Sequence, residues 1–273
     1  MASLMIDAEK CTKCGICMEE CPANLIMIVG EGDLPSWVRG AETACLNCGH
    51  CVAVCPAVAL ELSSMSVDQC VPVIKELQPA PEQIEQFLKS RRVIRTYRKE
   101  PVEHGKLVKL FDIARYAPSG HNDQPVQWLV IEKREKVHQL AQMTIDWLGE
   151  LTQKNPDLAK RFAVKAIKRS WEKGIDKITR GAPHLVIAHT GKDSIRTNDC
   201  YIALTYLELA AHSMGIGACW AGYIHAAATY SEPFARALEL PDGNACFGAM
   251  MIGYPKNKFA RIPVRNDAQV IWH

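Results

Sequence analysis

Eight of the twelve cysteines in this 273-residue chain lie between residues 11 and 55, in two runs with identical spacing. In each run two residues separate the first three cysteines, and a fourth cysteine follows after three more residues and precedes proline. The runs are Cys11-x-x-Cys14-x-x-Cys17-x-x-x-Cys21-Pro22 and Cys45-x-x-Cys48-x-x-Cys51-x-x-x-Cys55-Pro56. Three thiolates at this spacing can hold one face of an iron-sulfur cube, and the fourth reaches a second cube. The spacing therefore predicts two [4Fe-4S] clusters.

This duplicated run resembles that of bacterial ferredoxins. The resemblance assigns Cys11, Cys14, Cys17 and Cys55 to cluster one, and Cys45, Cys48, Cys51 and Cys21 to cluster two. Gly15 and Gly49 would let backbone amides approach the sulfurs. The alternatives are zinc knuckles and disulfides, but zinc sites use paired C-x-x-C units without a trailing Cys-Pro. We expect the remaining cysteines to be small buried residues and His50 to be solvated.

Composition limits the classes of partner. The net charge is +2, from 32 basic and 30 acidic residues, so no excess of one sign favours nucleic acid or an anionic membrane. The stretch from Met1 to Lys10 lacks the features of a signal peptide. The longest apolar stretch, from Tyr201 to Trp220, is interrupted by Glu208 and His212 and does not predict a membrane span. We expect a cytoplasmic protein, where thiols stay reduced and available to metals.

Two domains and a linker are predicted. Residues 1–62 form the cysteine-rich domain, 63–81 a linker with several prolines, and 82–273 a larger domain. In the larger domain, helical periodicity predicts helices over 81–91, 102–116 and 199–214, with Gly215 and Gly217 ending the last. Amphipathic helices are expected over 134–180, separated near Asn155-Pro156, and strands over 127–132, 185–189 and 247–254. We expect the 134–180 segment to cover a substrate pocket.

A basic segment opens the larger domain: Arg91-Arg92-Val93-Ile94-Arg95-Thr96-Tyr97. It resembles the entry motif of the nitroreductase family of FMN enzymes, in which basic side chains hold the flavin phosphate. Guanidinium groups suit that task because they stay charged and bind phosphate through two hydrogen bonds. The resemblance implies that Arg91, Arg92 and Arg95 bind the cofactor. Val93 replaces the family's usual serine.

A loop rich in turn-forming residues follows at Ala117-Pro118-Ser119-Gly120-His121-Asn122-Asp123-Gln124-Pro125. It is similar to the loop that in nitroreductases packs on the isoalloxazine ring and reaches across a dimer interface. Amide side chains both donate and accept hydrogen bonds, as the pyrimidine edge of a flavin requires. The resemblance implies cofactor contacts from Pro118, Ser119, Gly120, Asn122 and Gln124.

The third matching segment runs from Leu209 to Gly222 and resembles the family's long helix and glycine-rich turn. It implies ring contacts from Trp220, Ala221, Gly222 and Tyr223, with a backbone N–H directed at flavin N5. Near the C-terminus, Arg261-Ile262-Pro263-Val264-Arg265 resembles the closing motif, whose late basic residue returns to the phosphate. Arg265 is the preferred candidate and Arg261 the second.

These resemblances predict an α+β protein, in which a ferredoxin-like domain precedes a nitroreductase-like domain with a mainly antiparallel sheet flanked by helices. They imply a homodimer that passes electrons from an external low-potential donor, ferredoxin or similar, through both clusters to FMN. The acceptor would be a small organic molecule such as a nitroaromatic, a quinone or an activated alkene. Because such clusters are labile to oxygen, we expect an anaerobic or microaerobic host.

Two alternatives stay open at this point. One is direct reduction of the flavin by NAD(P)H, although no G-x-G-x-x-G or P-loop motif is present. The other is a non-catalytic electron-transfer subunit. No catalytic residue is assigned, because we expect His121, His184, His212 and His225 to be packing or surface residues.

Overall fold

The structure is a computed structural model that describes residues 3–273, and it separates into two units. The first runs to Pro79 and also includes Gly120–Asp123, which come from the middle of the glycine- and asparagine-rich loop. The second comprises Ala80–Ser119 and Gln124–His273. The linker predicted at 63–81 therefore falls mainly in the first unit, and four residues of the predicted flavin loop do as well.

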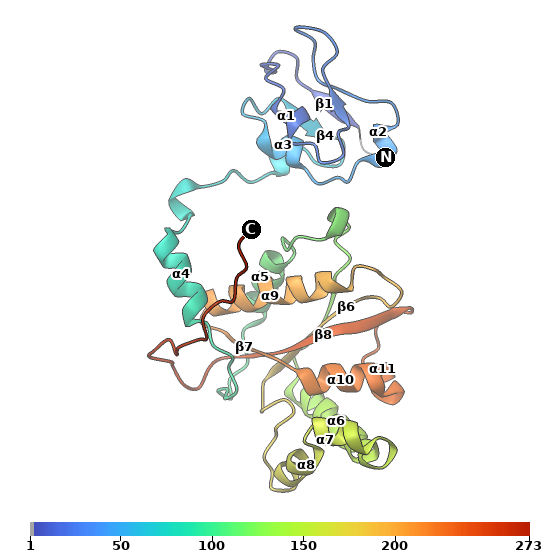
Figure 1. Cartoon of the computed structure of the whole chain (residues 1–273), viewed down its shortest axis with the longest axis vertical. Coiled ribbons are helices and arrows are strands. Elements are labelled where there is room, and N and C mark those ends of the chain that lie inside the picture. The colour runs from blue at the N-terminus through green and yellow to red at the C-terminus, as the bar shows by residue number, and fades with distance from the viewer. Residues whose placement is uncertain (1–2) are drawn as a thin grey trace. The chain divides into compact units, whose positions relative to one another are not determined.

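The first unit consists of very short elements (blue in Figure 1). Strand β1 (Leu4–Ile6) pairs with β4 (Leu60–Leu62), and β2 (Ile26–Met27) pairs with β3 (Ser36–Trp37), both antiparallel. The helices are α1 (Ile16–Glu19), α2 (Ala41–Ala44) and α3 (His50–Val54), with 3-10 turns at Val67–Gln69 and Lys75–Leu77. The main cluster of buried side chains in this unit consists of Cys17, Ile26, Val52, Leu60 and Leu62. A core this small does not stabilise a domain of this size by itself.

Four antiparallel strands form the sheet of the second unit, in the order β5-β6-β8-β7. The strands are β5 (Gln127–Ile131), β6 (His184–Gly191), β7 (Gly217–Trp220) and β8 (Asn244–Gly253). The two central strands are almost entirely buried, which explains their continuous apolar sequence. Their side chains alternate between the two faces of the sheet, so Met250 and Met251 pack in different clusters.

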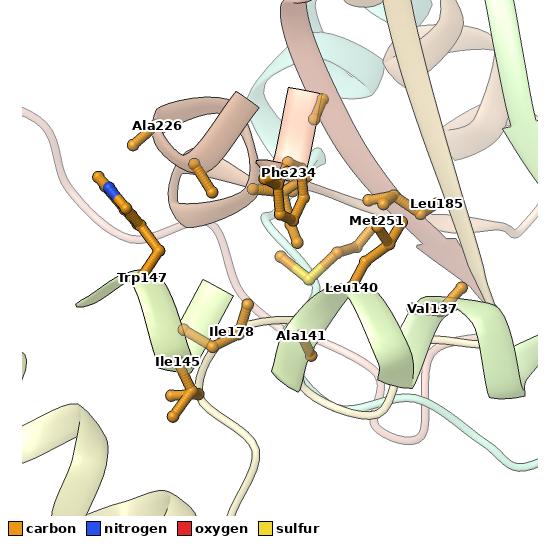
Figure 2. Packing of buried hydrophobic residues seen from close by; sticks show 14 of the residues in the cluster. Val137, Leu140, Ala141, Ile145, Trp147, Ile178, Leu185, Ala226, Phe234 and Met251 are labelled. Carbon is orange, nitrogen blue, oxygen red and sulfur yellow. The ribbon is translucent and has the colours of Figure 1, made fainter. Parts of the chain in front are cut away.

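Helices cover both faces of this sheet (Figure 1). On one face lie α5 (His104–Ala114) and α9 (Thr197–Ser213). On the other lie α6 (Arg134–Lys154), α10 (Gly222–Tyr230) and α11 (Glu232–Ala237). Figure 2 shows Leu140, Leu185, Phe234 and Met251 meeting between α6, α11 and the sheet. The remaining helices are α4 (Pro81–Ser90), α7 (Pro156–Arg161) and α8 (Val164–Glu172).

The predicted α+β fold with its antiparallel sheet and flanking helices is confirmed. The expected break at Asn155-Pro156 separates α6 from α7, because Asn155 Oδ1 accepts a hydrogen bond from Leu158 N at 3.1 Å and caps α7. The secondary structure of residues 217–237 differs from the prediction, which placed a glycine-rich turn after the long helix. Gly215 ends α9 with a φ of +70°, but Gly217 begins an edge strand rather than a turn, and two helices follow. Among residues 3–273 no helix is long and apolar enough to cross a bilayer.

Candidate functional site

The cysteines of the first unit enclose two cavities, and each cavity draws on both runs. Cys11, Cys14 and Cys17 line one cavity together with Cys55. The other is lined by Cys45, Cys48, Cys51 and Cys21. This is the exchange of fourth cysteines that the spacing predicts. Within residues 3–273 no three side chains of His, Cys, Asp or Glu surround the position of a single ion.

Backbone amides point at the cysteine sulfurs in both cavities. Leu25 N donates to Cys21 Sγ at 3.3 Å, and Ala59 N donates to Cys55 Sγ, also at 3.3 Å. Asn47 N donates to Cys45 Sγ at 3.4 Å. Gly15 and Gly49, each with a positive φ, precede α1 and α3 and begin the turns that present the third cysteines.

Burial makes a free thiolate unfavourable at Cys51. It raises the pKa of Cys51 to about 11, although the Val52 amide partly offsets the effect. The iron ions of a bound cluster would reverse this preference, because coordination to a metal ion deprotonates a thiol. The thiol set and the amide donors around it therefore fit iron-sulfur clusters.

A basic cavity of about 410 Å³ lies in the second unit, where α4 ends against α9. Arg91 and Arg92 line it with Arg98 and Lys258. One carboxylate is present, Glu208, whose Oε1 lies 2.9 Å from Arg91 Nη1. The excess of positive charge suits an anion such as a phosphate.

His212 lies in the same cavity but adds no charge to it. Its ring packs at a tilt against Phe87, with 4.9 Å between the ring centroids, and its Nε2 lies 3.3 Å from Ser90 Oγ. Burial, with the nearby Arg91 charge, lowers the pKa of His212, so the ring is neutral near pH 7. Sequence reasoning treated His212 as a packing residue and overlooked Lys258, whose only signal was its place in a basic C-terminal segment.

Arg95 does not line this cavity. Its charge acts instead on Tyr97 and Cys219, and Arg180 acts on the same two groups. For both groups, burial raises the pKa and the two arginines oppose that effect. Arg180 therefore acts with Arg95 on Cys219, which lies in β7, and no sequence motif identified Arg180.

A turn before β6 holds Arg180 in place. The Asp176 carboxylate accepts hydrogen bonds from Ile178 N, Thr179 N and Gly181 N at 2.8, 2.8 and 2.9 Å. Arg180 itself has a φ of +56° inside this turn. Such a conformation is uncommon for residues other than glycine and is retained here by the surrounding hydrogen bonds.

The predicted ring-contact residues lie where β7 ends and α10 begins. Ala221 N donates to Ala249 O of β8 at 2.8 Å, so this N–H is already used in a hydrogen bond to the sheet. The first helical bond of α10 runs from His225 N to Ala221 O, and the amides of Gly222, Tyr223 and Ile224 therefore have no acceptor within the helix. A Cβ atom built on Gly222 would have no neighbour within 4 Å. The start of α10 thus offers backbone donors beside open space, as a flavin ring would require.

The side chains around this position have structural partners. The Trp220 ring stacks on Tyr201 at 5.9 Å between centroids, and Tyr223 Oη donates to Phe162 O at 3.1 Å. Contacts to a cofactor from this segment would therefore come chiefly from its backbone.

The loop at 117–125 is divided between the units. Pro118, Ser119 and Gln124 line a cavity of about 110 Å³ in the second unit, and Gln124 N donates to Ser119 Oγ at 2.9 Å. Gly120 and Asn122 belong to the first unit. There Asn122 Nδ2 donates to Asn47 O at 3.0 Å.

The two C-terminal arginines lie apart from the basic cavity. Arg261 and Arg265 are exposed, and the cavity is lined instead by the preceding segment, Asn257–Phe259. Of the basic residues in this segment, Lys258 lines the cavity, whereas Arg261 and Arg265 do not.

Two family models match the chain. A nitroreductase family model matches residues 88–254, and a 4Fe-4S dicluster domain model matches residues 10–60. The chain is similar to a putative NADH dehydrogenase/NAD(P)H nitroreductase of Methanothermobacter thermautotrophicus, with 26% identity over 62% of this chain and 75% of the relative. A protein of the same description from Archaeoglobus fulgidus is 23% identical over 65% of this chain and 88% of the relative.

Solved structures share the fold of the second unit. A nitroreductase with bound FMN from Desulfitobacterium hafniense superposes with a TM-score of 0.56 and 21% identity, over 71% of this chain and all of that one. A nitroreductase with bound FMN from Bacteroides fragilis gives 0.55 and 20%, over 70% and 99%. Since the first family model covers more than half of the chain, this protein belongs to the nitroreductase family and carries a 4Fe-4S dicluster domain ahead of its nitroreductase domain.

Proposed function

We propose that this chain is an FMN-dependent oxidoreductase that receives electrons through its own iron-sulfur unit and delivers them to a small organic acceptor. The observation that carries the proposal is the pair of four-cysteine cavities in a chain that also contains a nitroreductase domain. Iron-sulfur clusters transfer electrons singly, whereas FMN accepts them singly and can pass on a pair as hydride.

The protein would bind FMN at three groups of residues. Arg91, Arg92 and Lys258 supply positive charge for the phosphate. The amides at the start of α10 supply donors for the ring, beside the open space at Gly222. Arg95 and Arg180 supply positive charge near the end of β7, where it would favour electron-rich forms of the cofactor. The FMN-bound structures with this fold support the assignment.

Each four-cysteine cavity would hold one [4Fe-4S] cluster, with the ligands assigned by spacing. The amide donors to Cys21, Cys45 and Cys55 would stabilise the negative charge on the sulfurs. The electron source would be an external low-potential donor such as ferredoxin, since a fused cluster unit serves little purpose if hydride reaches the flavin directly.

A homodimer is also part of the proposal. The segment that includes Arg261, Arg265 and Trp272 is exposed, and these side chains could pack against the surface of a second copy. Arg261 and Arg265 would then complete the phosphate site of the other copy.

Direct reduction by NADH or NADPH is the second candidate function. The descriptions of the Methanothermobacter and Archaeoglobus relatives, which name NADH and NAD(P)H, favour it. In that case the clusters would store electrons or export them.

Cofactor content and donor preference together test the proposal. Anaerobically purified protein should contain about eight irons, about eight acid-labile sulfides and about one FMN per chain. Reduced ferredoxin should then bleach the flavin absorbance faster than NADH or NADPH at equal concentration. Fast bleaching by NADH with none by ferredoxin would establish the second candidate, and absence of flavin would refute both.

A further inference from the structure

One asparagine connects the glycine-rich loop to the second cysteine run. Asn122 and its neighbours from Gly120 to Asp123 belong to the first unit. The Asn122 Nδ2 group donates to Leu46 O at 3.3 Å and to Asn47 O at 3.0 Å. Leu46 and Asn47 lie between the ligand positions Cys45 and Cys48. The amide therefore contacts the backbone that wraps the proposed cluster two.

A single peptide group lies between the Asn122 side chain and a cysteine sulfur. The carbonyl of Leu46 and the N–H of Asn47 belong to the same peptide group, and Asn47 N donates to Cys45 Sγ at 3.4 Å. A donor on the carbonyl oxygen polarises the peptide and strengthens the hydrogen bond that its N–H makes. Hydrogen bonds to the sulfurs of an iron-sulfur cluster are among the factors that set its reduction potential.

Asparagine suits both ends of this contact. Asn47 has a φ of +50° and Asn122 a φ of +57°, in the left-handed region that asparagine adopts more readily than most residues. Ser64 Oγ also donates to Asn47 Oδ1 at 2.6 Å, which restrains the same turn through its side chain. In the first run the equivalent residue is Lys13, and its ammonium group reaches Gly32 O. The two clusters are therefore in different hydrogen-bonding environments.

We propose that Asn122 is a positioning residue that raises the reduction potential of cluster two through the Leu46–Asn47 peptide. The inference rests on the proposed assignment of Cys45 as a cluster-two ligand. It gives Asn122 a role outside flavin binding.

Replacing Asn122 by glycine tests this role. Glycine adopts the same φ without strain but carries no donor. The readout is an EPR-monitored redox titration of the full-length, anaerobically purified holoprotein, after iron and sulfide analysis has shown both clusters present. We expect the equilibrium constant for reducing one cluster to fall about threefold, which corresponds to about 28 mV toward more negative potential at 59 mV per tenfold change. The other cluster should keep its potential.

The direction of the shift separates tuning from loosening of the loop. Greater exposure to water would move the potential upward, because water stabilises the more negatively charged reduced cluster. Ser64→Ala is the matched control, since it removes a hydrogen bond to the Asn47 side chain and leaves the peptide group untouched. It should leave both potentials unchanged.

Several results would overturn the inference. They are unchanged potentials in Asn122→Gly, an upward shift in that variant, or an equal downward shift in Ser64→Ala. Loss of a cluster from the parent protein would instead refute the ligand assignment in the proposed function. Loss of FMN from Asn122→Gly with unchanged cluster potentials would indicate that Asn122 binds the flavin, and it would also overturn the inference.

Discussion

Substituting valine for Gly222 tests where the flavin ring binds. Gly222 is the first residue of α10, is exposed, and has no atom within 4 Å of the position that a Cβ would take. The free energy of unfolding of the apoprotein should change by no more than about 0.5 kcal/mol, as for exposed sites without special contacts. The new side chain would, however, occupy the space in which we propose that the ring lies against the α10 amides.

The loss of affinity follows from this overlap. Forcing extra methyl groups into a filled site typically costs about 1–3 kcal/mol. At 1.4 kcal/mol for each factor of ten, FMN should bind about 5 to 150 times more weakly. The assay is titration of the apoprotein with FMN, followed by flavin fluorescence, alongside thermal unfolding of the same samples.

Gly105→Val is the matched control. Gly105 is also exposed near the start of a helix, α5, with no atom within 4 Å of its Cβ position. It should leave FMN affinity unchanged. Parent-like affinity in Gly222→Val would refute the placement of the ring at α10, and equal weakening in both variants would do the same.

Three further substitutions test the packing, the phosphate site and the pH dependence. Gly217→Ala should lower the melting temperature, because its Cβ would lie 2.6 Å from Ile94 Cγ1 and overpacking costs about 1–3 kcal/mol. Arg92→Ala should weaken FMN binding about 10- to 150-fold, measured by the same titration, since a hydrogen bond to a charged group contributes about 1.5–3 kcal/mol. His184 accepts a hydrogen bond from the Val102 N–H at 2.8 Å, and burial lowers the pKa of His184 from 6.5. The folded state therefore favours the neutral ring, so the free energy of unfolding should be highest above pH 6.5 and should fall below it by up to about 1.4 kcal/mol per pH unit. His184→Gln should reduce that pH dependence in thermal unfolding.

Each of these has its own control. Gly191→Ala meets no atom within 4 Å and should melt close to the parent temperature. Arg236→Ala removes an exposed arginine that pairs with Glu232 and does not line the basic cavity, so an equal loss of FMN affinity there would discredit the phosphate assignment. If His184→Gln kept the full pH dependence, the other histidines with lowered pKa values, such as His189, would have to account for it.

The parts of this protein that could be predicted are those specified by local sequence. Cys21 and Cys55 each line the cavity of the other run, as the spacing predicts, and their role as cluster ligands stays a prediction. The buried strands and amphipathic helices followed from periodicity. Asn155 and Pro156 marked the boundary between α6 and α7 because capping is local.

The parts that could not be predicted depend on long-range contacts. Strand β7 begins at Gly217 because pairing with β8 and packing against Ile94 override the glycine's tendency to end a helix. Arg180 acts on Tyr97 and Cys219 from a turn that Asp176 organises, and no local pattern predicts this. The contact of Asn122 with the second cysteine run spans 75 residues, and no local pattern encodes it.

Rapid mixing with reduced ferredoxin tests the central claim most directly. The parent protein, Cys14→Ala and Cys70→Ala would each be mixed anaerobically with reduced ferredoxin while flavin absorbance is followed. Cys14 lines one of the four-cysteine cavities, whereas Cys70 lies in the same unit and lines neither. The account predicts fast flavin reduction in the parent and in Cys70→Ala, and at least tenfold slower reduction in Cys14→Ala with FMN still bound. Equal rates in all three would contradict electron transfer through the clusters.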